Sequence, residues 1–116
     1  DVQIKCDVDK VQRVFDNLLR NAVNYSFENG KISIIVAQNE ESISIKFTNR
    51  GNTIPKEKLE RIFEQFYRLD TARSSRSGGA GLGLAIAKEI VELHGGCISA
   101  RSEDEEIEFE VILPVS

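Results

Sequence analysis

A glycine-rich run that leads directly into a helical pattern is the feature that most constrains this chain. Gly78, Gly79, Gly81 and Gly83 supply four glycines in six residues, which allow positive φ and a close approach to the backbone. From Leu84 to His94 apolar residues recur at helical spacing, so the glycines precede a helix N-terminus. The unpaired N–H groups and the positive dipole end of such a helix suit a phosphate group. A flexible hinge or a packing turn is the simpler alternative.

Two common phosphate motifs do not fit this run. A Walker loop needs Lys followed by Ser or Thr after its last glycine, and here Leu84 and Ala85 follow. A dinucleotide-binding fingerprint needs a third glycine at the position of Leu84, and a strand just before the loop. Residues 71–77 are polar and basic and have no strand character. Both motifs are therefore excluded.

The composition is that of one globular domain over residues 1–116. Hydrophobic residues make up 41% and charged residues 29%, and no apolar run approaches the roughly 20 residues of a membrane helix. The net charge of −4 argues against nucleic-acid binding. Cys6 and Cys97 are too few for a zinc site or a disulfide framework, so we expect reduced thiols. Because the sequence starts at Asp1 without an initiator Met, we expect a piece of a longer protein.

Periodicity and turn residues predict the element order β-α-β-β-α-loop-α-β-β. This order predicts an α/β two-layer sandwich, with a mixed, largely antiparallel five-stranded sheet and about three helices packed on one face. A region without apolar period is predicted to form a mobile loop. The predicted strands are residues 3–6, 31–38, 42–48, 97–102 and 107–113. The first predicted helix runs from a cap at Asp7 or Asp9 to Tyr25, and the other two cover residues 55–63 and 84–94. The predicted loop covers residues 69–79.

Polar side chains form a row on the first predicted helix. Asn17, Asn21, Asn24 and Tyr25 fall within an arc of roughly a quarter turn, away from the centre of the apolar face. Asparagine is a mediocre helix former, so three of them lower the helix propensity. The row is either a solvated polar face or a set of amides that faces a ligand or a hydrated metal.

Two further segments have open interpretations. Residues 49–55 form a predicted turn directly after a strand, where open sheets usually meet ligands. Phe63 and Phe66 are either core aromatics on one helical turn or anchors of a lid beside the basic loop.

These segments together resemble a known family along almost the whole chain. Residues 17–22 match an N box, 49–54 the first glycine box, 63–66 an F box and 79–84 the second glycine box. The chain is similar to the ATP-binding catalytic domain of bacterial sensor histidine kinases. That domain has the Bergerat-type fold shared with gyrase, the heat-shock chaperone and the mismatch-repair ATPase. Within the family, residues 49–54 and 59–94 look most similar to vancomycin-resistance sensors of the VanS type.

The resemblance implies a Mg-ATP site. Asn21 would give its side-chain oxygen to Mg²⁺, and Asn17 would support the same polar face. Arg68, at the start of a lid over about residues 64–80, would neutralise phosphate charge. The other implied contacts are Tyr25 and Ile54 at the adenine, Asn49 at its amino group, Asn24 and Gly51 nearby, Arg73 and Arg76 as weaker phosphate ligands, and the backbone of Gly79, Ala80, Gly81, Leu82, Gly83 and Leu84 at the phosphates.

The chain departs from the family pattern at three of these positions. Asn49 stands where the family has an adenine-reading aspartate, so one acceptor oxygen is kept and an amide is added, and we expect weakened adenine affinity. Thr53 replaces the second glycine of its box and could narrow the pocket through its Cβ. Asn24 replaces a common Lys or Arg, for which the lid arginines could compensate.

The resemblance implies phosphoryl transfer to a histidine on a separate dimerisation domain. It also implies a response regulator as a further partner. This chain has only His94, at a helix C-terminus, so we expect no catalytic residue here. One alternative is an ATP hydrolase of the same superfamily, but the general-base glutamate of those enzymes is replaced by Asn17, which takes no proton. Another is a nucleotide-sensing module without catalysis. We expect a cytoplasmic domain of a membrane sensor, with no direct membrane contact of its own.

Overall fold

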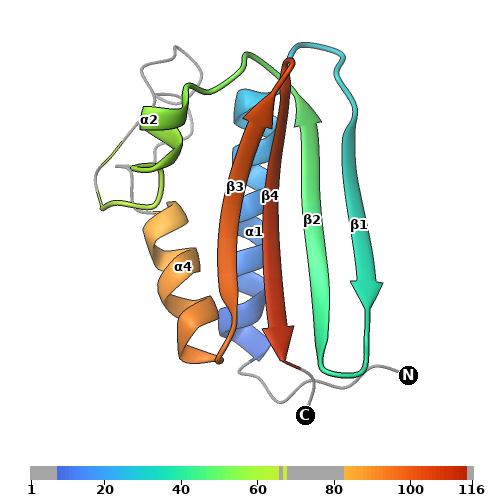
Figure 1. Cartoon of the computed structure of the whole chain (residues 1–116), viewed down its shortest axis with the longest axis vertical. Helices are drawn as coiled ribbons and strands as arrows, with labels where there is room; N and C mark the ends of the chain where they lie inside the picture. The colour runs from blue at the N-terminus through green and yellow to red at the C-terminus, as the bar shows by residue number, and fades with distance from the viewer. Residues whose placement is uncertain (1–7, 66, 68–82, 115–116) are drawn as a thin grey trace.

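A four-stranded antiparallel sheet with helices against it forms the described part of the chain (Figure 1). The structure is a computed structural model that describes residues 8–65, 67 and 83–114. The strand order is β1-β2-β4-β3, and every pair of neighbouring strands is antiparallel. The elements are α1 (Val8–Tyr25), β1 (Ile32–Gln38), β2 (Ser42–Arg50), α2 (Lys56–Leu59), α4 (Gly83–Leu93), β3 (Cys97–Glu103) and β4 (Glu106–Pro114).

The core lies between the helices and one face of the two central strands. Every second residue of β2 and β4 points inward, because side chains alternate along a strand. Phe47 and Phe109 are cross-strand partners at the centre of this face and are almost fully buried. The helices α1 and α4 close the core with the following buried residues: Val14, Leu18, Ala22, Leu84, Ala87, Ile90 and Val91.

The predicted α/β class is confirmed. The described residues contain four of the five predicted strands, and the pairing of these four is wholly antiparallel. A fifth strand and a mixed pairing are not confirmed. The strand predicted over residues 3–6 lies outside the described residues, as does the loop predicted over 69–79.

Two element boundaries also differ. The helix predicted over 55–63 is confined to Lys56–Leu59, because the next backbone N–H groups bond three residues back: Arg61 donates to Lys58 O at 3.0 Å and Glu64 to Arg61 O at 2.9 Å. Strand β2 continues to Arg50, so Asn49 lies inside the strand and not in the turn after it.

We predict that Phe109→Ala lowers the free energy of unfolding by about 3–5 kcal/mol, because it opens a cavity at the centre of the core. Phe27, which is 38% exposed, offers the matched control, and Phe27→Ala should give a clearly smaller loss. Urea unfolding followed by circular dichroism measures both. Equal losses would contradict the assignment of the core.

Candidate functional site

The polar row of α1 faces the N-terminus of α4. The Asn17 side-chain Nδ2 donates to the backbone oxygen of Gly83 at 3.0 Å, a contact between residues 66 apart in sequence. The Asn21 Nδ2 donates to the backbone oxygen of Asn17 at 2.9 Å. No other described residue bonds to the side-chain oxygen of Asn21. Among the described residues, none therefore blocks this oxygen as a ligand. It lies one helical turn from Asn17, which contacts the start of α4, where the first N–H groups have no partner within the helix.

A buried amide lies at the end of β2 on the same side of the sheet. Asn49 is only 1% exposed, and it points inward between its cross-strand partners Ile32 and Ile107. Within the part of the chain that the structure describes, neither its Nδ2 nor its Oδ1 has a hydrogen-bond partner. Leaving a buried polar group unsatisfied costs about 1–3 kcal/mol. A bound molecule that completes these hydrogen bonds would recover that cost.

The loop after β2 is fixed to the turn between β3 and β4. The Gly51 N–H donates to Glu105 O at 3.1 Å, and the Glu105 N–H donates to the Thr53 hydroxyl at 2.7 Å. The Ile54 N–H donates to the Ser102 hydroxyl at 2.9 Å. We call these three hydrogen bonds the turn latch. Thr53, which we expect could narrow the pocket, has an exposed side chain whose hydroxyl accepts a hydrogen bond from the turn.

The turn latch requires an unusual backbone on both sides. A Cβ on Gly51 would collide with the backbone oxygen of Tyr25, so only glycine allows this approach to the last turn of α1. Asp104 and Glu105 both have positive φ, of 51° and 60°, as a tight two-residue hairpin turn demands. The turn residues are thus committed to the geometry that holds the loop.

The remaining predicted site residues divide into two sets. Ile54 and Leu84 are buried in the core at 5% and 7% exposure, and Asn24 and Tyr25 are half-buried on the last turn of α1. Arg68, Arg73, Arg76, Gly79, Ala80, Gly81 and Leu82 lie outside the described residues, as does most of the lid predicted over 64–80.

Of the predicted aromatic pair Phe63 and Phe66, the structure describes Phe63, which packs against the core. The Phe63 ring packs edge-on against Phe109, with ring centres 6.3 Å apart, and the Lys88 Nζ lies 6.0 Å from the centre of the Phe63 ring. Tyr67 receives the guanidinium of Arg61 at 4.8 Å from its ring centre. Phe66 lies outside the described residues.

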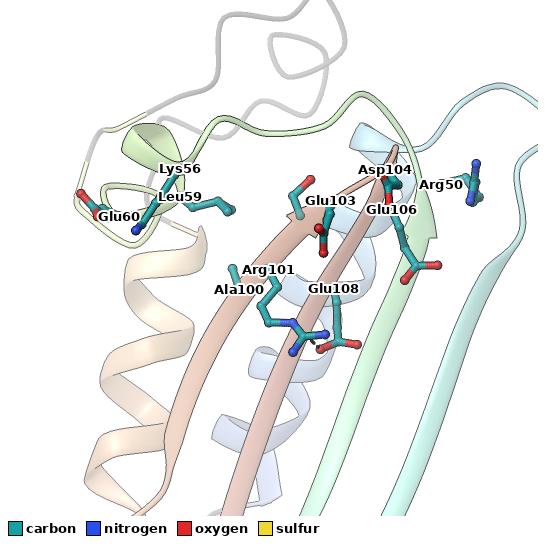
Figure 2. A pocket seen from close by; sticks show the side chains of 11 residues that line it. Arg50, Lys56, Leu59, Glu60, Ala100, Arg101, Glu103, Asp104, Glu106 and Glu108 are labelled. Atoms are coloured by element: carbon teal, nitrogen blue, oxygen red, sulfur yellow. Dashed lines mark ion pairs between the residues drawn. The ribbon is translucent and has the colours of Figure 1, made fainter.

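A charged hollow of about 840 Å³ opens beside β3 and α2 (Figure 2). Arg101 and Glu108 point toward one another there, with 3.7 Å between Nε and a carboxylate oxygen. These side chains lie on the face of the sheet turned away from Asn49, because they stand at the alternate positions of their strands. The hollow is lined by Arg50, Lys56, Leu59, Glu60, Ala100, Arg101, Ser102, Glu103, Asp104, Glu106 and Glu108.

Two other kinds of site are absent from residues 8–65, 67 and 83–114. These residues contain no group of three or more His, Cys, Asp or Glu side chains that could hold a metal ion. None of their helices is both long enough and apolar enough to cross a membrane.

Comparison with protein families gives a match over nearly the whole chain. Residues 6–116 match the family described as histidine kinase-, DNA gyrase B-, and HSP90-like ATPase. Sensor protein VanS of Enterococcus faecium is 54% identical over 114 residues, which is 98% of this chain and 29% of that protein. Sensor histidine kinase WalK of Bacillus subtilis is 47% identical over 104 residues, 88% of this chain and 17% of that protein. The chain thus spans less than a third of these curated relatives.

Solved structures show the same fold. The mycobacterial sensor histidine kinase MprB has a TM-score of 0.87 and 29% identity, and the match covers 98% of this chain and 78% of that one. Histidine kinase ThkA in complex with the response regulator TrrA has a TM-score of 0.81 and 29% identity, covering 100% of this chain and 31% of that one.

We predict that Ser102→Ala removes one bond of the turn latch and lowers the free energy of unfolding by about 1 kcal/mol. Hydrogen exchange of the Ile54 amide should become faster, because its acceptor is lost. The control is Ser99→Ala, an exposed serine on the same strand, which should leave that amide unchanged. Ser102→Thr keeps the hydroxyl and should restore protection. An Ile54 amide that exchanges equally in all variants would refute the latch.

Proposed function

The chain belongs to the family of histidine kinase-, DNA gyrase B- and HSP90-like ATPases, and from this membership we propose that it binds Mg-ATP and presents the γ-phosphate to a histidine on a separate dimerisation domain. The observation that carries the proposal is Asn49, a buried amide on the helix-covered face of the sheet, whose two polar atoms have no hydrogen-bond partner among the described residues. Nothing in a closed apolar core requires an amide there, whereas a purine base offers the hydrogen bonds it lacks.

At the base end, the proposed contacts come from rigid elements. Asn49 would accept a hydrogen bond from the adenine amino group, and Tyr25 and Ile54 would lie against the ring. Gly51 would contribute by allowing the loop backbone to lie close to the last turn of α1. The turn latch supports this role, because it fixes the backbone of residues 51–54 to the sheet. A fixed loop spends little conformational entropy when a ligand binds.

At the phosphate end, the proposed contacts come from α1 and the start of α4. The Asn21 side-chain oxygen is of the type that Mg²⁺ accepts, and Asn17 holds α1 to Gly83. The backbone from Gly79 to Leu84 would bind the phosphates, with Asn24 beside them and Arg68 as the counter-charge. When bound, Mg²⁺ neutralises charge that develops on the transferring phosphoryl group.

The chain supplies positioning rather than a proton acceptor, and this favours a kinase over a hydrolase. The Asn17 amide is held by Gly83 O and has no basic atom for activating water. His94 has its Nδ1 within 2.8 Å of Ile90 O at the end of α4, so it is occupied by its own helix. The acceptor histidine would therefore come from another domain. We further propose that a response regulator takes the phosphoryl group and that the domain works on the cytoplasmic side of a membrane sensor.

We predict that Asn21→Ala weakens Mg-dependent ATP binding by more than about tenfold, because the metal loses its one protein ligand in the described site. Calorimetry with Mg-ATP measures the change, and circular dichroism shows that the fold survives. Asp16→Ala, an exposed change on the same helix, is the control. An unchanged affinity in Asn21→Ala would remove Asn21 from the site.

A second experiment tests the reaction itself. Mixing this chain with the histidine-bearing dimerisation domain of a sensor kinase and γ-labelled Mg-ATP should give acid-labile phosphohistidine on that domain. His94→Ala should label it equally, because His94 bonds to its own helix. Release of labelled phosphate to water alone would favour a hydrolase, and binding without any transfer would favour a nucleotide-sensing module.

A further inference from the structure

An asparagine reads a base differently from a carboxylate, and this difference bears on which nucleotide the site accepts. We propose that Asn49 gives this site dual purine specificity, so that it binds guanine nucleotides as well as adenine nucleotides. The inference rests on the proposed function, because it concerns the base end of the same site. It starts from the finding that both polar atoms of Asn49 are buried and unpartnered among the described residues.

The chemistry follows from the two atoms of the amide. Its oxygen accepts a hydrogen bond and its nitrogen donates, whereas an ionised carboxylate only accepts. Adenine presents an amino donor at C6 beside an acceptor at N1, and guanine presents an acceptor at C6 beside an N–H donor at N1. Guanine therefore offers the reverse of the adenine pattern. A half turn of the terminal torsion exchanges the oxygen and nitrogen of the amide, so one side chain complements either edge.

The surroundings of Asn49 do not fix the amide in one orientation. Its cross-strand partners on both sides are isoleucines, Ile32 and Ile107, which offer no hydrogen bond. The hydroxyls of the adjoining loop and strand, Thr53 and Ser102, already accept bonds from the N–H groups of Glu105 and Ile54. Since no described side chain bonds to either atom of the amide, the half turn breaks no hydrogen bond within the described protein.

The backbone at this position is fixed, so only the side chain has to adapt. Asn49 is paired with β1 on one side and β4 on the other, and the loop that follows is held by the turn latch. A change of base is therefore met by rotation of one amide and not by movement of the strand. An acceptor-only side chain in the same place would repel the C6 oxygen of guanine and keep adenine alone.

The test is calorimetric titration of the whole chain with Mg-ATP and with Mg-GTP. In the unsubstituted chain the two dissociation constants should lie within about tenfold of each other. In Asn49→Asp the ratio of the GTP dissociation constant to the ATP dissociation constant should rise by at least about tenfold. The reason is that the side chain loses the N–H group that would donate to the C6 oxygen of guanine. The matched control is Asn52→Asp, the same chemical change at an exposed residue of the adjoining loop, which should leave the ratio unchanged.

A ligand-side measurement serves if Asn49→Asp does not fold. Mg-ITP keeps the C6 oxygen and the N1 donor of guanine but lacks its 2-amino group, so it should bind within about tenfold of Mg-GTP. Much weaker binding of Mg-ITP would show that the C6 edge is not what the site reads, and would overturn the inference.

The outcomes separate the inference from the proposed function. If Mg-ATP binds and Mg-GTP binds more than about a hundredfold more weakly, dual specificity is refuted while the proposed function stands. If both bind but Asn49→Asp leaves the ratio unchanged, the assignment to Asn49 is refuted. If neither nucleotide binds, the proposed function fails and the inference fails with it.

Discussion

The alternation of side chains along β2 is the constraint on which this structure depends. Ile43 and Phe47 point into the core, and with the same period of two the next inward position after Phe47 is Asn49. An apolar residue at position 49 would simply extend the core between β1 and β4. The amide instead leaves two polar atoms buried and unpartnered among the described residues. Inward-facing positions of a core strand are normally apolar, and an exception in an otherwise consistent core is expected at a functional position. Here the exception, Asn49, coincides with the base end of the proposed site.

Much of the fold could be predicted from the sequence because its signals are local. Alternating residues predicted the central strands, and Asn39 predicted the first hairpin turn, where its side-chain oxygen accepts the N–H groups of Glu41 and Ser42. The short helix α2 was overestimated, because Pro55 marks a helix start but does not determine how far the helix continues. The end of β2 was placed before Asn49, because asparagine and glycine suggest a turn even where a neighbouring strand continues the ladder.

The candidate site was only partly predictable, because some of its contacts depend on register. The polar row of α1 has a local signal, since its members repeat at helical spacing. Ser102 has none: it is one serine in a strand, and it meets Ile54 only because β3 pairs with β4 in one register and the loop after β2 folds over the turn. The family pattern singles out Thr53 as a residue that could narrow the pocket, but it gives no sign of the hydrogen bond between its hydroxyl and the Glu105 N–H. A pattern shows that a side chain is unusual and not which distant group it contacts.

The two ends of the proposed site are held by different parts of the fold. At one end, Asn49 is embedded in a sheet whose hydrogen bonds fix its backbone, so a bound base would meet a preorganised surface. At the other, the bond from Asn17 to Gly83 joins α1 to the start of α4, so the proposed metal ligand Asn21 is placed relative to the phosphate end by that bond. The side-chain N–H of Asn17 is already used in this hydrogen bond, and its amide has no basic atom. An arrangement that would hold a nucleoside triphosphate at both ends, and in which Asn17 offers no basic atom to activate water, is suited to a nucleophile that arrives with its own reactive group, as a histidine on another domain would.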